Sequence, residues 1–321
     1  MASPSKEENV LRLILENSPL KEWHFEEIVR EAKVTKAVAN KWLKKYEHEG
    51  LIKKYPCYFD YSKFGYNYFV SILVKLENFD LIDKFVERSI KSKNLICIGK
   101  MIGKYDLYMD LIFKNEKEFN LYLDKLNLEN DIDDLFIMKY NFTELYPLKF
   151  LDAGNYNEKN YFIVGEAKER KFDRTEIEIL RLLKDNSRIR LIDIANKLNI
   201  SSELALYKLK KLENEKIILG SRVLFDMKKL GYFYSGVLMN IKNLSENEKE
   251  KIKRFARSHA YTNSLGFFNS KPNCFIQFFH KTHEELRKSL EELKHLLKDK
   301  IEGFDVLFIE EEEYFNTLPF S

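Results

Sequence analysis

Cysteine, glycine and proline are scarce in this sequence, and it contains no long apolar run. Its three cysteines are widely separated and odd in number (Cys57, Cys97 and Cys274), so neither a disulfide framework nor a zinc site is indicated. No stretch is apolar enough to cross a bilayer, and the start, MASPSKEENV, lacks the apolar core of a signal peptide. We therefore expect a cytoplasmic protein without a membrane partner, and we predict no metal and no cofactor.

A large excess of one charge is also lacking, but the charge is unevenly distributed. Hydrophobic residues make up 45% of the chain and charged residues 33%, which is typical of a soluble globular protein. The formal net charge is +3. Residues 5–55 contain 11 Lys and Arg against 9 Glu, and residues 168–222 contain 14 against 9 Asp and Glu, so the remainder is net negative. Two separated basic windows suit modules that bind phosphate groups.

The chain contains an internal repeat with an offset of 166 residues. Val34–Glu47 aligns with Ile200–Glu213 and Phe59–Tyr68 aligns with Phe225–Tyr234, and no insertion separates the two blocks. The length of 321 residues is itself too great for one ordinary domain. Because the repeat is far longer than a solenoid unit, it indicates a duplicated two-domain protein rather than a repeat array.

Each half begins with a pattern typical of a helix-turn-helix. Two apolar helices and a tight turn lead to a third helix, expected at residues 36–49 and 202–215. Thr35 and Ser201 are natural N-caps for this helix, since their hydroxyls can accept from free amides of the first turn. In the first half, the two preceding helices are expected at residues 10–15 and 25–32, and short antiparallel strands for a wing and hinge at 51–59. In the second half, the helices are expected at 177–183 and 191–198, and the strands at 217–225.

After the hinge, each half shows β-α-β-β-α-β periodicity, the order of a ferredoxin-like fold. The expected strands are residues 66–76, 96–102, 107–113 and 133–140, then 232–241, 262–268, 274–280 and 304–311. The expected helices are residues 81–89, 116–126, 246–258 and 283–298. Two helices cover one face of such a sheet, so the two domains can cover the other face for each other. Core and sheet-to-sheet packing accounts for most of the 25 Phe and 18 Tyr.

The predicted fold class is therefore α+β, with two winged helix-turn-helix domains and two ferredoxin-like (βαββαβ) sandwich domains in tandem. The winged helix-turn-helix domains are expected at residues 5–60 and 172–226. The ferredoxin-like domains are expected at residues 61–151 and 227–321, and a linker rich in Asn, Gly and charge is expected at 152–171.

These patterns together resemble the Lrp/AsnC family of prokaryotic transcription regulators, also called feast/famine regulators. The second half is most similar in the helix-turn-helix, where Ile194–Ser201 leads into Lys208–Glu213. The first half is most similar in the hairpin Gly103–Asp106, which resembles the family's Gly-x-Tyr/Phe-Asp motif. The resemblance covers nearly all of both halves and implies an effector and dimerisation role for the ferredoxin-like domains. Ordinary members carry one copy and form dimers, so this tandem chain resembles two fused members that imitate the dimer.

The resemblance implies a sequence-specific DNA-binding transcription regulator, not an enzyme, whose partner is double-stranded DNA. It also implies a small-molecule effector such as an amino acid, and homo-oligomers. The candidate DNA-contacting residues lie on the third helices or flank the second helix and the wing: Thr35, Lys36, Asn40, Lys41, Lys44, Arg188, Arg190, Ser201, Ser202, Tyr207, Lys208, Lys210 and Arg222. The structural alternative is a solvated charged helix face.

The sequence departs from the family where the recognition helix usually carries several arginines. Those positions hold Asn40, Lys41 and Trp42 in the first half, and Leu206, Tyr207 and Lys208 in the second. Since Lys acts as a point charge rather than a bidentate fork, we expect weaker recognition of guanine. Unlike helices also suit a non-palindromic site.

The effector hairpin has two interpretations. Gly103, Tyr105 and Asp106 could line a small-ligand site, but they also fit a hairpin turn in which Gly103 takes a positive φ and Asp106 closes the turn. The corresponding hairpin of the second half, Asn269–Asn273, lacks the motif, so no conventional amino-acid site is expected there. The pair His280 and His283 lacks a partner pattern for a metal.

Two other functions remain open. One is an enzyme that resembles siroheme decarboxylases on the same scaffold, which would need histidines and basic residues to converge, whereas the six histidines are scattered in sequence. The other is an interaction or sensor protein that has lost DNA binding, as apolar Leu206 and Trp42 in the recognition helices would allow. An exposed Trp42 would mark a contact surface, and a buried one a core residue.

Overall fold

The computed structural model describes residues 29–319 except 31, 147, 150–160 and 163–168. The first helix predicted for the first half, most of the second, and most of the predicted linker lie outside the described residues. The chain divides into two compact units, and each draws on both halves of the sequence. The helical unit comprises the described parts of Met1–Phe59, Tyr146–Tyr161 and Phe172–Gly231. The barrel unit comprises those of Asp60–Leu145, Phe162–Lys171 and Tyr232–Ser321.

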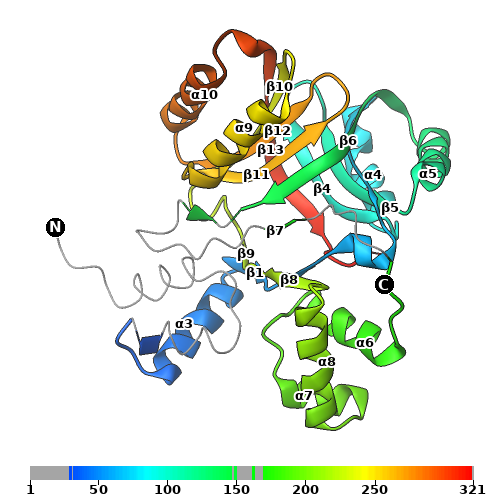
Figure 1. The fold of residues 1–321 in the computed structure, drawn as a ribbon, viewed down its shortest axis with the longest axis vertical. Coiled ribbons are helices and arrows are strands. Elements are labelled where there is room, and N and C mark those ends of the chain that lie inside the picture. Colours follow the sequence, from blue (N-terminus) through cyan, green and yellow to red (C-terminus); the bar gives the residue numbers. More distant parts are fainter. Residues whose placement is uncertain (1–28, 31, 147, 150–160, 163–168, 320–321) are drawn as a thin grey trace. The chain divides into compact units, whose positions relative to one another are not determined.

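The helical unit holds the third helix of the first half and all three expected helices of the second (Figure 1). They are α3 (Lys36–His48), α6 (Arg174–Leu183), α7 (Leu191–Leu198) and α8 (Ser202–Asn214). The Thr35 hydroxyl accepts from the Val38 amide and the Ser201 hydroxyl from the Leu204 amide, at 3.3 and 3.2 Å. Both predicted N-caps are therefore confirmed.

The short antiparallel strands predicted for the wing and hinge are present, and they pair between the two halves. They are β1 (Ile52–Lys54), β2 (Cys57–Phe59), β8 (Ile218–Ser221) and β9 (Leu224–Phe225). β1 is antiparallel to β9, and β2 is antiparallel to β8. Ile52 lies opposite Phe225, and Phe59 lies opposite Ile218. Ile52 corresponds to Ile218 in the repeat and Phe59 to Phe225, so the two contacts are equivalent. This self-complementary ribbon has the pairing of a two-fold dimer contact within one chain.

Eight antiparallel strands of the barrel unit close into a ring (Figure 1). The first half supplies β3 (Tyr68–Leu76), β4 (Leu95–Ile102), β5 (Leu107–Phe113) and β6 (Ile132–Leu145). The second supplies β10 (Phe233–Ile241), β11 (Thr262–Phe268), β12 (Cys274–His280) and β13 (Ile301–Phe315). The order is β11-β12-β10-β13-β4-β5-β3-β6, and β6 pairs with β11 to close it. A short strand, β7 (Tyr161–Phe162), extends the sheet beyond β6.

The last strand of each half is longer than its sequence pattern predicts. β6 has 14 residues and β13 has 15, whereas residues 133–140 and 304–311 were expected. The extra length serves pairing with the other half: β6 pairs with β3 up to Lys139 and with β11 from Tyr140 to Leu145. β13 likewise pairs with β10 and then with β4. The two ferredoxin-like domains, predicted to pair face to face, are thus also joined along their sheet edges. This pairing leaves neither edge of either four-stranded sheet open.

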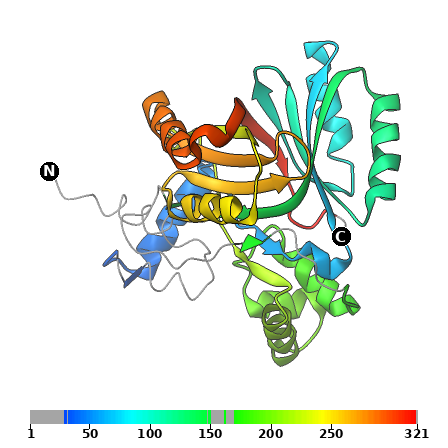
Figure 2. The ribbon, with the colours of Figure 1, turned by 45° about the horizontal axis from the view of Figure 1, so that its top comes forward.

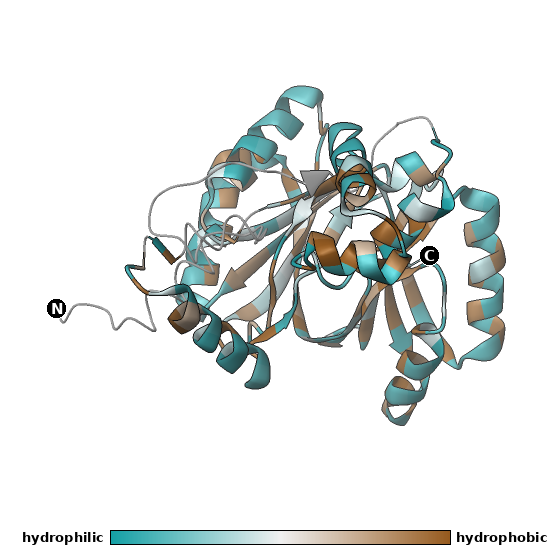
Figure 3. Ribbon diagram, turned by 90° about the horizontal axis from the view of Figure 1, so that it is seen from below, coloured by the Kyte–Doolittle hydropathy of each residue, from teal (hydrophilic) through white to brown (hydrophobic). Residues whose placement is uncertain are grey.

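Helices cover the outside of the barrel, as the ferredoxin-like order predicts. In Figure 2 helices lie against the outside of the strands of both halves, and in Figure 3 hydrophilic colours dominate the outer helices. These helices are α4 (Ile82–Ser89), α5 (Glu116–Glu129), α9 (Glu246–Ser258) and α10 (His283–Leu297). The short 3-10 turns are η1 (Tyr61–Phe64), η2 (Phe79–Leu81) and η4 (Lys298–Lys300).

Side chains from both halves fill the barrel interior, as expected for an eight-stranded barrel. Phe69 and Tyr108 from the first half share one buried cluster with Phe275 from the second. The seam between β6 and β11 depends on glycine, because a Cβ at Gly266 would lie 2.2 Å from the Tyr140 ring. The aromatic residues of the strands are thus core residues, as predicted.

The repeat shifts by one residue at the start of the barrel unit. β3 and β10 correspond with an offset of 165 rather than 166. Tyr68 therefore packs on the helix side, against Phe119, whereas Tyr234 packs toward the barrel interior and stacks on Phe279. The final residue pair of the sequence alignment is not structurally equivalent.

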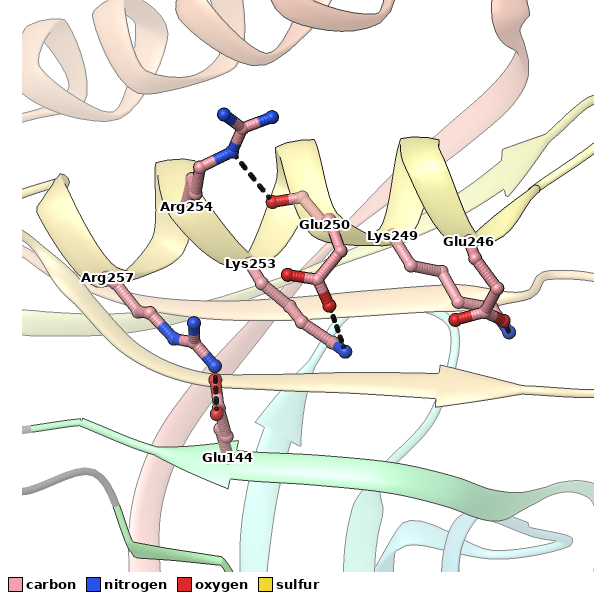
Figure 4. A network of polar contacts seen from close by, with 7 residues as sticks. All are labelled: Glu144, Glu246, Lys249, Glu250, Lys253, Arg254 and Arg257. Carbon is pink, nitrogen blue, oxygen red and sulfur yellow. Dashed lines mark hydrogen bonds and ion pairs between the residues drawn. The ribbon is translucent and has the colours of Figure 1, made fainter.

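An ion pair with one buried member also joins the halves (Figure 4). Arg257 reaches from α9 to Glu144 on β6, with Nη2 2.7 Å from Oε1. One turn earlier, Lys253 lies over the Phe142 ring at 4.4 Å. Glu144 is fully buried, so its negative charge depends on partners inside the protein.

His280 is a fully buried histidine at the end of β12. Its Nε2 lies 2.8 Å from the Ser289 hydroxyl, and its Nδ1 has no hydrogen-bond partner. The rings of Phe233, Tyr261 and Phe278 pack around it. Burial lowers the pKa of His280 to about 4, so the imidazole is neutral at pH 7.

We expect the free energy of unfolding to fall as the pH is lowered from about 6.5 to about 4. Over this window the unfolded state binds a proton that the folded state does not, which costs up to about 1.4 kcal/mol per pH unit. Above pH 6.5 the imidazole is neutral in both states, so it contributes no pH dependence. Urea denaturation at a series of pH values would measure the slope in wild type and in H280Q. The matched control is H295Q, on α10. Equal slopes for wild type and H280Q would contradict the prediction.

Candidate nucleic-acid interface

The outward side of α3 brings together the five residues predicted for the first half. The helix buries Ala39, Leu43 and Tyr46, so positions on its opposite side face away from the core. The predicted residues on this surface are Thr35, Lys36, Asn40, Lys41 and Lys44, all exposed except for half-buried Asn40. The sequence lacks acidic residues in the first turn of this helix, so the surface is basic and hydrogen-bonding.

The corresponding surface of α8 is less charged. The helix buries Ala205 and Leu212, and it exposes Tyr207 to 61% of its maximum. Ser201 and Lys210 are also exposed, and Ser202 is half-buried. Four of the five residues predicted for α8 and its cap therefore lie where a partner could reach them.

Lys208 is the exception on α8, because it lies against the start of α6. Its ammonium forms ion pairs with Asp173 and Glu176, and its side chain is only 16% exposed. The hydrogen bond to Asp173 raises the pKa of Lys208. Lys208, which was predicted to contact DNA, thus ties the third helix to the first.

Of the two arginines before α7, one is engaged inside the unit and one is at the surface. The Arg188 guanidinium lies 4.8 Å from the centre of the Tyr55 ring and 3.8 Å from Glu47, and its side chain is 20% exposed. The Tyr55 hydroxyl also donates to Glu47, at 2.7 Å. Arg190 instead forms a bidentate pair with Asp193 and keeps 64% of its side chain exposed. The phosphate role thus suits Arg190, while Arg188 joins the halves.

Arg222, which was predicted to contact DNA, is buried. Only 8% of the residue is exposed, and its Nη1 donates to the Tyr146 carbonyl at 2.8 Å. It lies between β8 and β9, in the ribbon that joins the halves. The sequence alone does not reveal that the halves pair in this ribbon, so it predicts an exposed wing position for Arg222.

The predicted effector hairpin has a structural role at all three positions. Gly103 takes a φ of +131°, which favours glycine, and the Asp106 carboxylate accepts from the Leu76 amide at 2.8 Å. Tyr105 is 6% exposed and belongs to the barrel interior. Gly103 thus has a conformation that favours glycine, the Asp106 side chain ties the hairpin to β3, and Tyr105 is buried in the barrel interior.

A polar cluster inside the barrel was missed by the sequence analysis. Asp110 accepts hydrogen bonds from Ser71 and Cys97, and Ser71 also contacts the Tyr140 hydroxyl. Burial raises the pKa of Asp110. The available signal was a polar residue at an inward position of an otherwise apolar strand. A carboxyl in an apolar barrel is costly when ionised, so the cluster holds it through hydrogen bonds.

The structure gathers three histidines that are separate in the sequence. The Tyr261 ring lies next to His259 and His280, and the Phe233 ring lies next to His280 and His283. Aromatic rings lie between these histidines, and no contact joins one imidazole to another among them. Within the described residues no group of three or more His, Cys, Asp or Glu is placed to hold a metal. No helix in that part of the chain has the length and apolarity to cross a membrane.

Trp42 lies on the side of α3 that leads into the core. It is half-buried, its indole nitrogen is buried, and it stacks on Tyr46 with ring centres 6.5 Å apart. By the criterion set above, its buried indole favours a core role over a contact surface.

Comparison with known proteins agrees with this architecture. Residues 172–218 match the profile of a family described as winged helix-turn-helix DNA-binding. An uncharacterized HTH-type transcriptional regulator of Pyrococcus horikoshii is 30% identical over 128 residues, which cover 39% of this chain and 79% of the relative. A second such regulator, of Pyrococcus furiosus, is 22% identical over 151 residues, 46% of this chain and 99% of the relative.

A solved structure of siroheme decarboxylase NirDL, in complex with an iron-uroporphyrin III analogue, has a similar fold over almost the whole chain. The TM-score is 0.63 at 14% sequence identity, and the match covers 99% of this chain and 95% of that one. At this identity the likeness shows the fold alone. The regulator relatives, the matched profile and the tandem arrangement of helix-turn-helix and ferredoxin-like parts agree. The chain belongs to the family of HTH-type transcriptional regulators of which the Pyrococcus horikoshii relative is a member.

Proposed function

We propose that this chain is a sequence-specific DNA-binding transcription regulator in which the two halves together imitate the dimer of single-copy family members. The observation that carries the proposal lies within the helical unit. There, two equivalent capped helices, α3 and α8, expose their outward sides, and a self-complementary ribbon joins their halves. Double-stranded DNA offers two successive major-groove segments to such a pair.

The exposed residues divide into two roles. At α3, Lys36, Lys41 and Lys44 supply charge toward phosphates, and the Asn40 amide can pair with adenine. At the second module, Tyr207 and Lys210 face outward, and Ser202 lies in the first turn of α8. Thr35 and Ser201 place the helix N-termini, and Arg190 adds a surface charge before α7.

An effector and higher assembly enter this proposal through the family resemblance. A small molecule such as an amino acid would bind to the barrel unit at a place other than the buried Tyr105. Light scattering with and without each of the twenty amino acids would detect a ligand that changes a homo-oligomer. If neither the molecular mass nor the melting temperature of the protein changes with any of the twenty, amino acids are excluded as effectors.

Filter binding to a random double-stranded DNA library tests the proposal. We expect binding at 50 mM salt, a steep loss of affinity toward 200 mM as counterions return to phosphates, and enrichment of one sequence class over rounds of selection. The salt slope counts phosphate contacts, and the enrichment measures specificity. No retention of DNA at 50 mM salt would refute DNA binding. Retention without enrichment would refute sequence specificity.

A second candidate is a siroheme-decarboxylase-like enzyme, favoured by the fold likeness to NirDL over nearly the whole chain. Titration with siroheme and inspection of its visible spectrum test this candidate directly. A shifted spectrum with loss of carboxyl groups from the tetrapyrrole would establish it. We expect neither change, because His280 is enclosed by aromatic rings rather than placed at an open surface.

A further inference from the structure

The two recognition helices share a framework but differ on the face that points outward. Both begin at a hydroxyl N-cap and bury an alanine at the equivalent position, Ala39 or Ala205. The outward faces, spaced i, i+3, i+4 and i+7, are Ala37, Asn40, Lys41 and Lys44 on α3, and Glu203, Leu206, Tyr207 and Lys210 on α8. At the two middle positions, Asn40 and Lys41 of α3 thus correspond to Leu206 and Tyr207 of α8.

These two apolar side chains on α8 are exposed to solvent. Leu206 is 41% exposed and Tyr207 is 61% exposed, in consecutive positions of one turn. The helix contains no arginine, so no bidentate fork for guanine is available from it. Yet α8 lies within residues 172–218, the part of the chain that matches the winged helix-turn-helix DNA-binding profile. At its two middle positions the outward face of α8 therefore offers apolar surface to the groove, where α3 offers an amide and an ammonium.

Thymine matches this apolar surface, because its C5 methyl group is the apolar group on the major-groove edge of DNA. We propose that Leu206 and Tyr207 contact thymine methyl groups, so that α8 selects a thymine-rich half-site, whereas α3 selects its half-site by hydrogen bonds and charge. This inference rests on the proposed function and specifies its ligand. Lys210, one turn beyond Leu206, is placed on the same face to meet a phosphate. The operator is accordingly two unlike half-sites.

Replacement of thymine by deoxyuridine removes only the methyl group and therefore tests the proposal. DNA enriched from the random library by the wild-type chain is resynthesised with deoxyuridine in one half-site at a time. We expect about a fourfold loss of affinity for each contacted methyl in the half-site bound by α8, the transfer cost of one buried carbon. Deoxyuridine in the other half-site is expected to leave the affinity unchanged.

Variants assign the effect to residues by double-mutant cycles. L206A and Y207A should bind more weakly to the thymine-containing DNA and should lose their sensitivity to deoxyuridine. N40A and K41A should weaken binding but keep that sensitivity. L128A is the matched control, since Leu128 is an exposed leucine (87%) on α5 of the barrel unit. Circular dichroism and melting temperature verify that each variant is folded.

The outcomes separate this inference from the proposed function. Enriched DNA that tolerates deoxyuridine in both half-sites overturns the methyl contacts but leaves DNA binding standing. L206A and Y207A that keep full affinity for every DNA also overturn the inference, and would assign the exposed face to a protein contact. If the wild-type chain retains no DNA at 50 mM salt, the proposed function itself has failed.

Discussion

Replacing Arg257 by methionine is expected to lower the free energy of unfolding of the barrel unit by about 2–4 kcal/mol. The Glu144 carboxylate is fully buried, and Arg257 supplies a charge-assisted hydrogen bond of 2.7 Å to it. Removing the guanidinium leaves a buried negative charge without that partner. The lower end of the range reflects the Arg257 side chain, which is 35% exposed and so partly solvated. Urea denaturation followed by circular dichroism measures the change.

The neighbouring arginine on α9 gives a matched control. Arg254 contacts only the Glu250 carbonyl, at 3.4 Å, among the residues drawn with it in Figure 4, so R254M should cost less than about 1 kcal/mol. The double variant E144Q/R257M should recover part of the loss, since it removes the buried charge as well as its partner. Equal effects of R257M and R254M would show that the ion pair does not stabilise the contact between the halves.

Loss of the two exposed charges on α3 is expected to lower affinity for DNA about ten- to a hundredfold at 150 mM salt. Lys41 and Lys44 lie on the outward face of α3 and are exposed. Each removed phosphate contact lowers the magnitude of the salt slope by about one, and each removed base contact costs about 1–3 kcal/mol. Filter binding of K41A/K44A against the enriched DNA, at several salt concentrations, measures both quantities.

Two lysines of the barrel unit provide a charge-matched control for this variant. Lys84 on α4 and Lys91 just beyond it are exposed, so K84A/K91A changes the net charge by the same amount. We expect its affinity and salt slope to match wild type. If the control loses as much affinity as K41A/K44A, the effect is one of overall charge and α3 is not the contact surface.

Local elements were largely predictable from the sequence. α7 has the expected bounds, and α8 ends one residue earlier than expected, because apolar spacing defines both helices locally and the Ser201 hydroxyl caps α8. The hydrogen-bonded turn at Gly103 and Asp106 was also predictable, since backbone geometry at a turn restricts residue type.

The site was less predictable than the fold. Three predicted contact residues proved to be internal: Lys208 forms ion pairs, Arg188 packs on Tyr55, and Arg222 is buried. A basic side chain beside a helix-turn-helix has the same sequence signature whether it faces a phosphate or a carboxylate within the fold. Burial and pairing depend on residues far along the chain, which local spacing does not encode.

By itself the sequence determined the duplication, the order of elements in each half and the N-caps of α3 and α8, because periodicity and capping act over a few residues. Only the tertiary structure decided that strands of the two halves pair with each other: β1 pairs with β9, and β6 pairs with β11. An unpaired edge offers the same donors and acceptors to any strand, so its partner is selected by packing of the whole unit. Tertiary structure also decided which charges remain exposed, since desolvation and ion pairing depend on the assembled neighbours.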